Sequence, residues 1–313
     1  MERDVLLQAK NITLKFGKNL VLKNLSIEVK QGEILGIAGV SGAGKTTLIN
    51  VLTGVLKPQN GRVVYNSRII NPQESKPIEL SKNRKLLTKL IGYSTQSSSF
   101  FEELTVVENL DFFGELWNVP SDIRKKNMKT LLELLALTDS KQQLGIKLSG
   151  GMKKRLDIAC ALIHNPKLLF LDEPTADLDP ILRGKIWKIV QGLNEQGTTF
   201  VIASHFLEEI ENVCSSTCIL HKGKITAKIP IKKKLTEIIV ATNSQSFKKE
   251  LLKSELFSQD EIISTPNLII VTRPINANEE KMIRKLAQNI GLEIKEIRSC
   301  SMALKTIFNE IAK

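Results

Sequence analysis

The segment GVSGAGKTT at residues 39–47 constrains the fold of this chain more than any other part of its sequence. It matches the pattern G-x-x-x-x-G-K-[ST], the P-loop, in which the backbone N–H groups of a glycine loop surround phosphate oxygens. The apolar run EILGIAGV leads directly into the segment, and a helical pattern begins at Lys45. A strand, a phosphate loop and a helix in this order predict an α/β protein that binds a nucleotide.

The pattern after residue 148 supports the same fold class. A helix from Ser149, the strand KLLFLD, a helix at 180–195, the strand TTFVIASH and a helix at 206–214 follow one another. Such alternation predicts a parallel sheet with helices on its faces. Ahead of the phosphate loop, the segments LLQAKNITLKF and LVLKNLSIEV flank the turn GKN, which predicts a β-hairpin at about 4–29.

Three further segments have simpler predictions. Helical spacing covers 104–137 and is interrupted at Pro120, which indicates a helical insertion. The strand GRVVYN precedes a lysine-rich stretch at 66–90 that is predicted to be a loop or a short helix. From about residue 230 the chain alternates strand and helix patterns, with a final helix from Ser301, and this predicts a small α+β domain.

Composition excludes several classes of protein. The chain of 313 residues has no run of 18 apolar residues and no export signal in MERDVLLQAK, so we expect neither a membrane span nor secretion. The 4 cysteines are too few for a disulfide framework and are expected to be reduced thiols, as in the cytosol. The net charge of +12 is spread along the chain with few aromatic residues between the lysines, so no nucleic acid partner is expected.

Two acids stand where a phosphate site needs them. In KLLFLDEP, Asp172 and Glu173 lie at the carboxyl end of a buried strand, the edge at which open α/β sheets bind ligands. Asp172 is predicted to hold Mg²⁺, directly or through water. Glu173 is predicted to orient or deprotonate the water that attacks the nucleotide.

A second anion site is predicted in KLSGGMKKRLDIA at residues 147–159. Ser149 is a good N-cap, and Gly150 and Gly151 allow a close approach to the exposed N–H groups at a helix start. One nucleotide does not need two phosphate cradles. The second cradle therefore raises the question of which nucleotide it serves.

In order and spacing, these motifs resemble the nucleotide-binding subunits of ABC-type ATPases over about residues 4–225. LSGGM is similar to the family signature LSGGQ, with Met152 in place of the usual glutamine. The resemblance implies an ABC-type ATP-binding domain at 1–228, with a mixed sheet core, an antiparallel β subdomain and a helical subdomain at about 97–145. A small α+β accessory domain at 229–313 would follow it, and its ending is loosely similar to the C-terminal domain of exporter ATPases.

The resemblance also implies roles for residues in hydrolysis. It implies that Lys45, Gln96, Glu173 and His205 act in catalysis, with His205 contacting the γ-phosphate. It implies that Thr46, Gln96 and Asp172 hold the Mg²⁺ ion. Gln96 would form the hinge between the sheet core and the helical subdomain.

The family pattern assigns ATP contacts to three separate places. Phe16 matches the aromatic residue that stacks on adenine. The phosphate loop comprises Gly39, Val40, Ser41, Gly42, Ala43, Gly44, Lys45, Thr46 and Thr47. The signature residues Ser149, Gly150 and Gly151, together with Asp179, would reach the ATP of a second subunit. Ala176 and Asp177 differ from the commonest family residues beside Asp179.

These roles imply partners. Two chains, a homodimer or a paired ATPase subunit, would hold two ATP molecules between one chain's P-loop and the other's signature helix. FFEELTVVENLDFFGELWNV in the helical subdomain resembles ABC-2-type exporters, in which this part contacts a membrane-spanning permease subunit. The chain would then be peripheral, on the cytoplasmic face of the cell membrane.

Two other classes of protein also contain a P-loop. A soluble ABC-type ATPase of translation, DNA repair or iron–sulfur assembly is the alternative function, although such proteins often have two ATPase domains or long coiled coils, and this chain has one domain and no sustained heptads. A P-loop kinase or GTPase leaves LSGGM, Gln96 and His205 unexplained.

Overall fold

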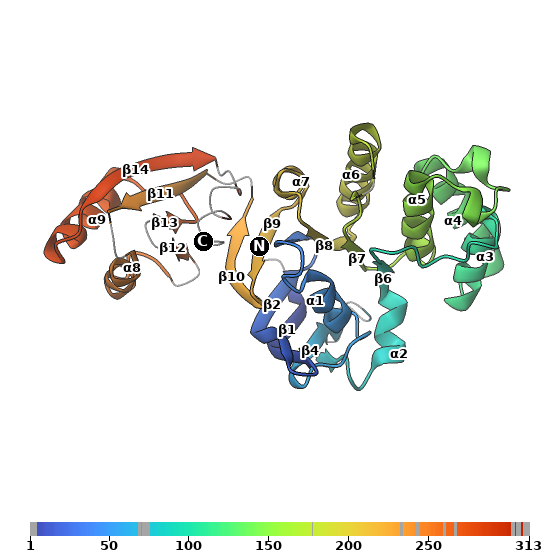
Figure 1. The fold of residues 1–313 in the computed structure, drawn as a ribbon, viewed down its shortest axis with the longest axis horizontal. Helices are drawn as coiled ribbons and strands as arrows, with labels where there is room; N and C mark the ends of the chain where they lie inside the picture. The colour runs from blue at the N-terminus through green and yellow to red at the C-terminus, as the bar shows by residue number, and fades with distance from the viewer. Residues whose placement is uncertain are drawn as a thin grey trace.

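The structure is a computed structural model with three β-sheets, one of which lies at one end of the longest axis (Figure 1). It describes residues 5–67, 70, 76–176, 178–231, 234–241, 244–258, 261–265, 268–301, 304 and 308. The central sheet carries the phosphate loop, an antiparallel sheet lies on one side of it, and the third sheet belongs to the C-terminal part. None of the helices in these described ranges is long and apolar enough to cross a membrane.

The central sheet has six strands in the order β10-β9-β3-β8-β7-β6. Its strands are β3 (Ile34–Ala38), β6 (Ile91–Ser94), β7 (Leu168–Asp172), β8 (Thr199–Ser204), β9 (Ser216–His221) and β10 (Lys224–Pro230). All neighbouring pairs are parallel except β9 with β10, so the predicted mixed sheet is confirmed. The β9–β10 hairpin was not predicted from the sequence.

Two apolar cores cover the two faces of this sheet. Successive residues of β7 point to opposite faces, so Leu168 and Phe170 join one core while Leu169 and Leu171 join the other. Helix α1 (Lys45–Leu52) packs in the first core, between the central and antiparallel sheets. Helices α5 (Gly150–Leu162), α6 (Pro180–Glu195) and α7 (Leu207–Val213) pack in the second. Burial on both faces explains why these strands read as continuous apolar runs.

The antiparallel sheet has the order β2-β1-β4-β5. It comprises β1 (Val5–Phe16), β2 (Asn19–Lys30), β4 (Asn60–Asn66) and β5 (Pro77–Glu79). Phe16 pairs with Asn19 across the turn, which confirms the predicted hairpin. In the lysine-rich stretch the structure has β5, α2 (Arg84–Leu87) and the 3₁₀ turn Thr88–Leu90, and residues 68–69 and 71–75 lie outside the described residues.

The helical insertion lies beyond β6, at the opposite end from the C-terminal part (Figure 1). Helix α3 (Val106–Leu116) begins with a capping box in which Thr105 and Glu108 satisfy each other's backbone N–H groups. Helix α4 (Ser121–Leu134) begins directly after Pro120, so the predicted interruption is confirmed. Short 3₁₀ turns at Thr138–Ser140 and Gly145–Lys147 lead back to α5.

The C-terminal part contains a four-stranded antiparallel sheet in the order β12-β13-β11-β14. Its elements are β11 (Lys234–Val240), α8 (Ser244–Lys253), β12 (Ile262–Thr265), β13 (Leu268–Val271), α9 (Ala277–Asn289) and β14 (Ile294–Ser301). The sequence pattern therefore gave the right class of small α+β unit. The predicted helix from Ser301 falls mostly outside the described residues.

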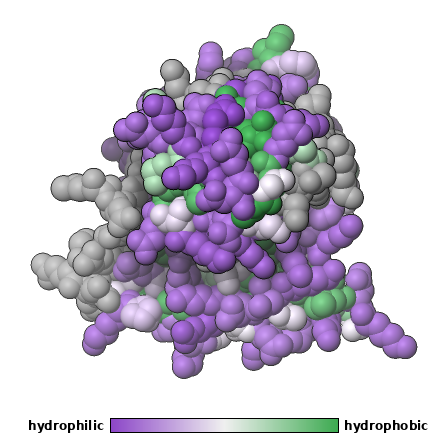
Figure 2. All heavy atoms as spheres, turned by 90° about the vertical axis from the view of Figure 1, so that its left-hand side faces the viewer, coloured by the Kyte–Doolittle hydropathy of each residue, from purple (hydrophilic) through white to green (hydrophobic). Residues whose placement is uncertain are grey.

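Strand β13 is buried on both of its faces. Ile269 and Val271 pack in a separate core with α8 and α9, whereas Leu268 and Ile270 pack in the core that also contains α6 and α7. Leu304 is buried in that shared core, and its N–H donates a hydrogen bond to Glu211 of α7. The C-terminal sheet is therefore docked against the rest of the chain. Its outward end is mostly hydrophilic (Figure 2).

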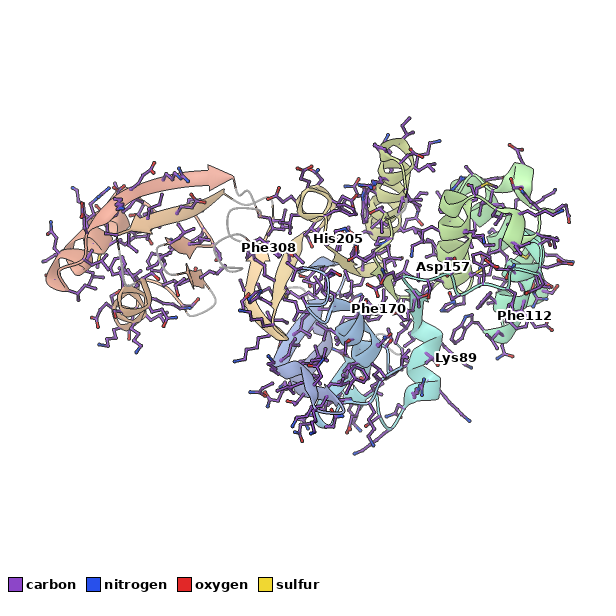
Figure 3. All side chains as sticks on the ribbon, viewed as in Figure 1. Lys89, Phe112, Asp157, Phe170, His205 and Phe308 are labelled. Carbon is purple, nitrogen blue, oxygen red and sulfur yellow. The ribbon has the colours of Figure 1, made fainter. Side chains whose placement is uncertain are left out.

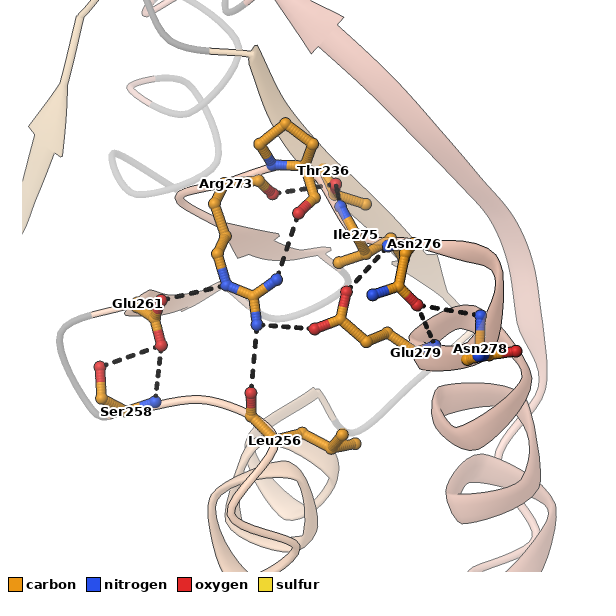
Figure 4. Close-up of polar contacts among 10 residues, drawn as sticks. Thr236, Leu256, Ser258, Glu261, Arg273, Ile275, Asn276, Asn278 and Glu279 are labelled. Carbon is orange, nitrogen blue, oxygen red and sulfur yellow. Dashed lines mark hydrogen bonds and ion pairs between the residues drawn. The ribbon is translucent and has the colours of Figure 1, made fainter.

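Arg273 holds together the loops at one edge of this C-terminal part (Figure 4). Its guanidinium donates to Glu261 at 3.1 Å, to Glu279 at 2.8 Å and to the Leu256 carbonyl at 3.2 Å. It also lies 4.9 Å from the ring centre of Phe257. Leu256, Phe257 and Glu261 belong to the connection before β12, and Glu279 lies in the first turn of α9, so one side chain joins these two segments.

Candidate active site

The phosphate loop connects β3 to α1, as its sequence predicts. Gly42 and Gly44 have φ values of 78° and 104°, which favour glycine. A Cβ atom on Gly39 would lie 2.7 Å from the Leu220 carbonyl oxygen, so only glycine fits there. Because α1 begins at Lys45, the first N–H groups of the helix have no intrahelical acceptor and are available to an anion.

Lys45 connects this loop to the acid that follows β7. Its side chain is 7% exposed, and Nζ donates to the carbonyls of Gly39 and Val40 at 2.9 and 3.3 Å. The same Nζ atom lies 3.2 Å from Oε1 of Glu173. The ammonium group is thus directed back into the loop by backbone carbonyls and by one carboxylate.

The carboxylate of Glu173 is held between two basic side chains. Its Oε2 atom lies 2.8 Å from Nδ1 of His205, while Oε1 contacts Lys45. Its backbone has a φ of 48°, in the left-handed region that side chains other than glycine rarely adopt. Its N–H donates to the Ala203 carbonyl of β8 at 2.9 Å, which fixes this conformation. Residues held in such strained conformations cluster at active sites.

Asp172, at the end of β7, is fully buried. Burial raises the pKa of its carboxyl, and the neighbouring carboxylate of Glu173 raises it further, whereas Thr46, Lys154 and Lys45 oppose the shift. Among the described residues, no hydrogen bond reaches either of its carboxylate oxygens. Two unpartnered buried carboxylate oxygens are costly unless a cation or a donor binds them.

The strand order brings the remaining predicted residues of this edge near one another. β6 is adjacent to β7, and Ser94 pairs with Leu171, so exposed Gln96 follows β6 at the edge where Asp172 ends β7. His205 follows β8 in the same way, and its side chain is 45% exposed (Figure 3). Phe16, at the end of β1, is 51% exposed, which leaves its ring face open for stacking.

The signature residues lie at the start of α5. The Ser149 hydroxyl caps this helix by accepting from the Met152 N–H at 3.3 Å. A Cβ atom on Gly151 would lie 2.9 Å from Cδ1 of Leu182, so the starts of α5 and α6 pack closely. At the start of α6, Asp179 accepts from the N–H groups of Ile181 and Leu182. Across the described ranges, no hydrogen bond or ion pair joins Ser149, Gly150 or Gly151 to Lys45, Asp172 or Glu173.

Sequence reasoning missed a polar network beneath this edge. Asp157 of α5 is fully buried, accepts hydrogen bonds from Ser94 and Ser99, and lies beside the end of β6 (Figure 3). Lys154, one turn earlier, donates to the carbonyls of Thr95 and Asp172. The available signal was the acid in LDIA, which interrupts the apolar face of α5.

Comparison with known proteins agrees with this geometry. Residues 22–176 match the family model described as ABC transporter. The chain is 31% identical to the bacitracin transport ATP-binding protein BcrA of Bacillus licheniformis, over 97% of this chain and 96% of that protein. It is 33% identical to the Nod factor export ATP-binding protein I of Cupriavidus metallidurans, over 71% of this chain and 70% of that protein.

A solved structure shares the fold of the larger part. The dimeric ATP-binding cassette MJ0796, bound to ADP and Pi, superposes with a TM-score of 0.65 at 26% identity, covering 72% of this chain and 99% of that one. The fold and the site define a P-loop ATPase of the ABC class. The chain belongs to the ATP-binding subunits of ABC transporters, and it is an ATP hydrolase that binds ATP. The soluble alternative is not favoured.

Proposed function

We propose that this chain powers export through a separate membrane-spanning subunit, by an ATP-dependent closing and reopening of two ATP-binding subunits. The carrying observation is that the chain has two sets of phosphate-binding donors, at α1 and at α5, with no direct polar contact between them among the described residues. A second copy, or a paired ATPase subunit, supplies the missing half of each site. The similar cassette MJ0796, which forms a dimer in its structure with ADP and Pi, supports this arrangement.

Each ATP would be bound mainly by one chain. The loop from Gly39 to Thr47 surrounds the phosphates, with Lys45 directed to the β- and γ-phosphates. Phe16 stacks on the adenine. Ser149, Gly150 and Gly151 of the other chain contact the γ-phosphate side, and Asp179 lies at the same interface because the starts of α5 and α6 pack together.

The site also fits Mg²⁺. The two unpartnered carboxylate oxygens of buried Asp172 are hard ligands of the kind that Mg²⁺ prefers, and the Thr46 hydroxyl and Gln96 carbonyl are suitable neighbours. When bound, the ion would neutralise charge on the β- and γ-phosphates. Raised pKa values of buried carboxyls fall when a cation binds, so Asp172 is suited to this role.

Hydrolysis would then use the residues that surround Glu173. Its carboxylate orients the attacking water or accepts its proton, and Lys45 stabilises charge on the γ-phosphate. The 2.8 Å contact between Glu173 and His205 fixes the histidine ring beside the same phosphate. All three residues come from different elements, so their alignment depends on the intact sheet.

The membrane subunit would dock beside the helical subdomain, at residues of about 97–145. A cavity of about 230 Å³ is lined by Phe113, Trp117 and Cys160 on one side and by Thr53 and Tyr93 on the other. Nearby apolar side chains are exposed: Phe101, Phe112 and Leu116. We propose that a cytoplasmic apolar helix of the permease occupies this groove, and the chain is then peripheral on the cytoplasmic face of the membrane.

The division into an ATP-binding domain at 1–228 and an accessory domain at 229–313 is part of the proposal. The accessory sheet has a core of its own, which supports this boundary. Its other face packs against α7 through Ile270 and Leu304.

Glu173→Gln tests the dimer. The amide cannot act as a base, so hydrolysis should fall by about 10²–10⁴-fold while ATP binding persists. Analytical ultracentrifugation should then show an ATP-dependent dimer that ADP does not support. A variant that stays monomeric at saturating ATP contradicts the proposed sandwich.

The transport role is tested by identifying the proteins that co-purify with this chain. Tagged full-length chain extracted in detergent should co-purify with one multispanning membrane protein. A Phe112→Asp variant should lose that protein without losing nucleotide binding, because the exposed ring lies far from the phosphate loop (Figure 3). Recovery with ribosomes or DNA, and without a membrane protein, contradicts the proposal.

A further inference from the structure

The side chains of Lys154 and Asp157 clamp the segment that carries Gln96. Lys154 Nζ donates to the Thr95 carbonyl at 2.7 Å, on one side of Gln96. Asp157 Oδ1 accepts from the N–H and the hydroxyl of Ser99, at 2.9 and 2.5 Å, on the other side. Its Oδ2 atom accepts from Ser94, the last residue of β6, at 2.5 Å. One turn of α5 therefore holds both ends of the Gln96 loop.

Lys154 also reaches the end of β7. Its Nζ lies 3.4 Å from the carbonyl oxygen of Asp172, and its charge lowers the pKa of the Asp172 carboxyl. The same helix begins at Ser149 and Gly150, the second phosphate cradle. Lys154 and Asp157 lie about 8 and 12 Å along the helix from Ser149, given a rise of about 1.5 Å per residue. A single rigid helix thus connects one phosphate cradle to the two strand ends of the other site.

Stability alone does not account for these charges. Lys154 is 13% exposed and Asp157 is fully buried, and their charged atoms are 3.9 Å apart. Desolvation of two such charges largely cancels their attraction, so apolar replacements of similar size are often neutral or stabilising. What the charges provide is a fixed position for the Thr95 and Asp172 carbonyls relative to α5.

We propose that Lys154 and Asp157 are positioning residues that transmit nucleotide binding at the α5 cradle to Gln96 and Asp172 of the same chain. This inference rests on the proposed ATP sandwich, since the α5 cradle must bind the other subunit's ATP. A displacement of α5 towards that ATP then shifts the Gln96 loop and the end of β7 together. The two ATP sites of a dimer are coupled through this contact.

The test is the steady-state kinetics of the purified full-length chain. Lys154→Met keeps the apolar stem and removes the ammonium, so kcat should fall at least about fivefold and the Hill coefficient for ATP should approach one, the range of ordinary coupling energies. ATP binding to the phosphate loop should be unchanged. Lys154→Arg keeps the charge and the donors, and should restore the Hill coefficient.

The matched control is Lys153→Met on the same helix. Lys153 pairs with Glu102 at 2.5 Å, and within the described ranges no hydrogen bond joins its side chain to either strand end, so its loss should leave the Hill coefficient at the wild-type value. Asp157→Asn should act in the same direction as Lys154→Met. The double variant should be no worse than either single one, because both act through one contact.

Three results overturn the inference. The first is a Lys154→Met chain with wild-type kcat and Hill coefficient. The second is a loss of activity that follows the loss of thermal stability and that Arg does not restore, which indicates a packing role. The third is the absence of any ATP-dependent dimer in Glu173→Gln, which removes the sandwich itself. A dimer that forms while Lys154→Met keeps its cooperativity contradicts only the coupling role.

Discussion

At the scale of single residues, the backbone of Glu173 has an unfavourable conformation that neighbouring residues stabilise. Glu173 adopts a left-handed backbone conformation that costs about 1–2 kcal/mol for a residue with a Cβ atom. Its contacts with Lys45 and His205 and its N–H bond to the Ala203 carbonyl keep it there. These three interactions offset the local cost.

That strain predicts which of two inactive variants is the more stable. Glu173→Gly should unfold at higher urea concentration than Glu173→Ala, by about 1 kcal/mol, because glycine adopts a φ of 48° without strain. Both variants should lose hydrolysis. In an ordinary helix or strand the order of stability would be reversed, and such an order here would contradict the strained geometry.

Asp172 supplies a prediction on pH. Its folded-state pKa is raised by burial, so the folded chain binds this proton more tightly than the unfolded chain. Its favourable contribution is therefore present at low pH and is lost as pH rises through the folded pKa. Asp172→Asn should stabilise the nucleotide-free chain more at about pH 7.5 than at about pH 4.5. Urea titrations at both pH values measure this gap, and a gap that does not widen with pH would sink the prediction.

At the scale of elements, the end of α5 is fixed to β6 by His164. Its Nε2 atom lies 3.1 Å from the Ile91 carbonyl oxygen, and its ring stacks on Trp117 with centres 4.7 Å apart. Burial lowers the pKa of His164 to about 4, against a smaller opposing effect of the Ile91 carbonyl. The ring is therefore neutral in the fold, with its proton on the nitrogen that faces Ile91.

The pH dependence of His164 has the opposite sign to that of Asp172. The contribution of neutral His164 is complete above the unfolded pKa of about 6.5 and is lost as pH falls through about 4. Relative to His164→Phe, which keeps the stacked ring, the wild type should lose up to about 3 kcal/mol between about pH 7 and pH 4. Parallel stability curves for the two chains would show that the histidine ring is already charged or exposed.

The elements could be predicted where their boundaries have a local cause. Ser149 and Asp179 are N-caps, and α5 and α6 begin directly after them. Strands β3, β7 and β8 read clearly because burial on both faces leaves only apolar residues. Strands β10 and β5 were missed because their polar, partly exposed sequences give no such signal.

The residues of the site could be predicted where a local sequence pattern places them. Strand ends and the glycine loop placed Lys45, Asp172 and Glu173 at one edge of the sheet. The contact of His205 with Glu173 follows from the adjacency of β7 and β8, which sequence order alone does not give. The contacts of Lys154 with Thr95 and Asp172 depend on how α5 packs, and so no local pattern could have found them.

At the scale of the whole molecule, the C-terminal sheet is joined to the rest of the chain through an apolar face and through the connecting chain. Ile270 packs in the core shared with α6 and α7, and its neighbour Ile269 packs in the accessory core. Both side chains are fully buried. A substitution at Ile270 therefore affects the shared core, whereas a substitution at Ile269 affects the separate core of the C-terminal sheet.

These two positions allow docking and folding to be separated. Ile270→Asp buries a charge between the domains and should undock the accessory sheet, which small-angle scattering would record as a larger radius of gyration with unchanged helical circular dichroism. Ile269→Ala should instead destabilise the separate core of the C-terminal sheet by about 2–5 kcal/mol. If Ile270→Asp left the radius of gyration unchanged, the shared core would not be what holds the domains together.

Strand β13 also limits how this chain can misassemble. A slip of one residue along a strand turns every side chain to the opposite face of the sheet. Because β13 is buried on both sides, the same slip would put every side chain into the wrong core at once. Two separate cores thus select a single register for Leu268–Val271. Packing against α6 and α7 therefore favours the correct pairing of β13 within the C-terminal sheet.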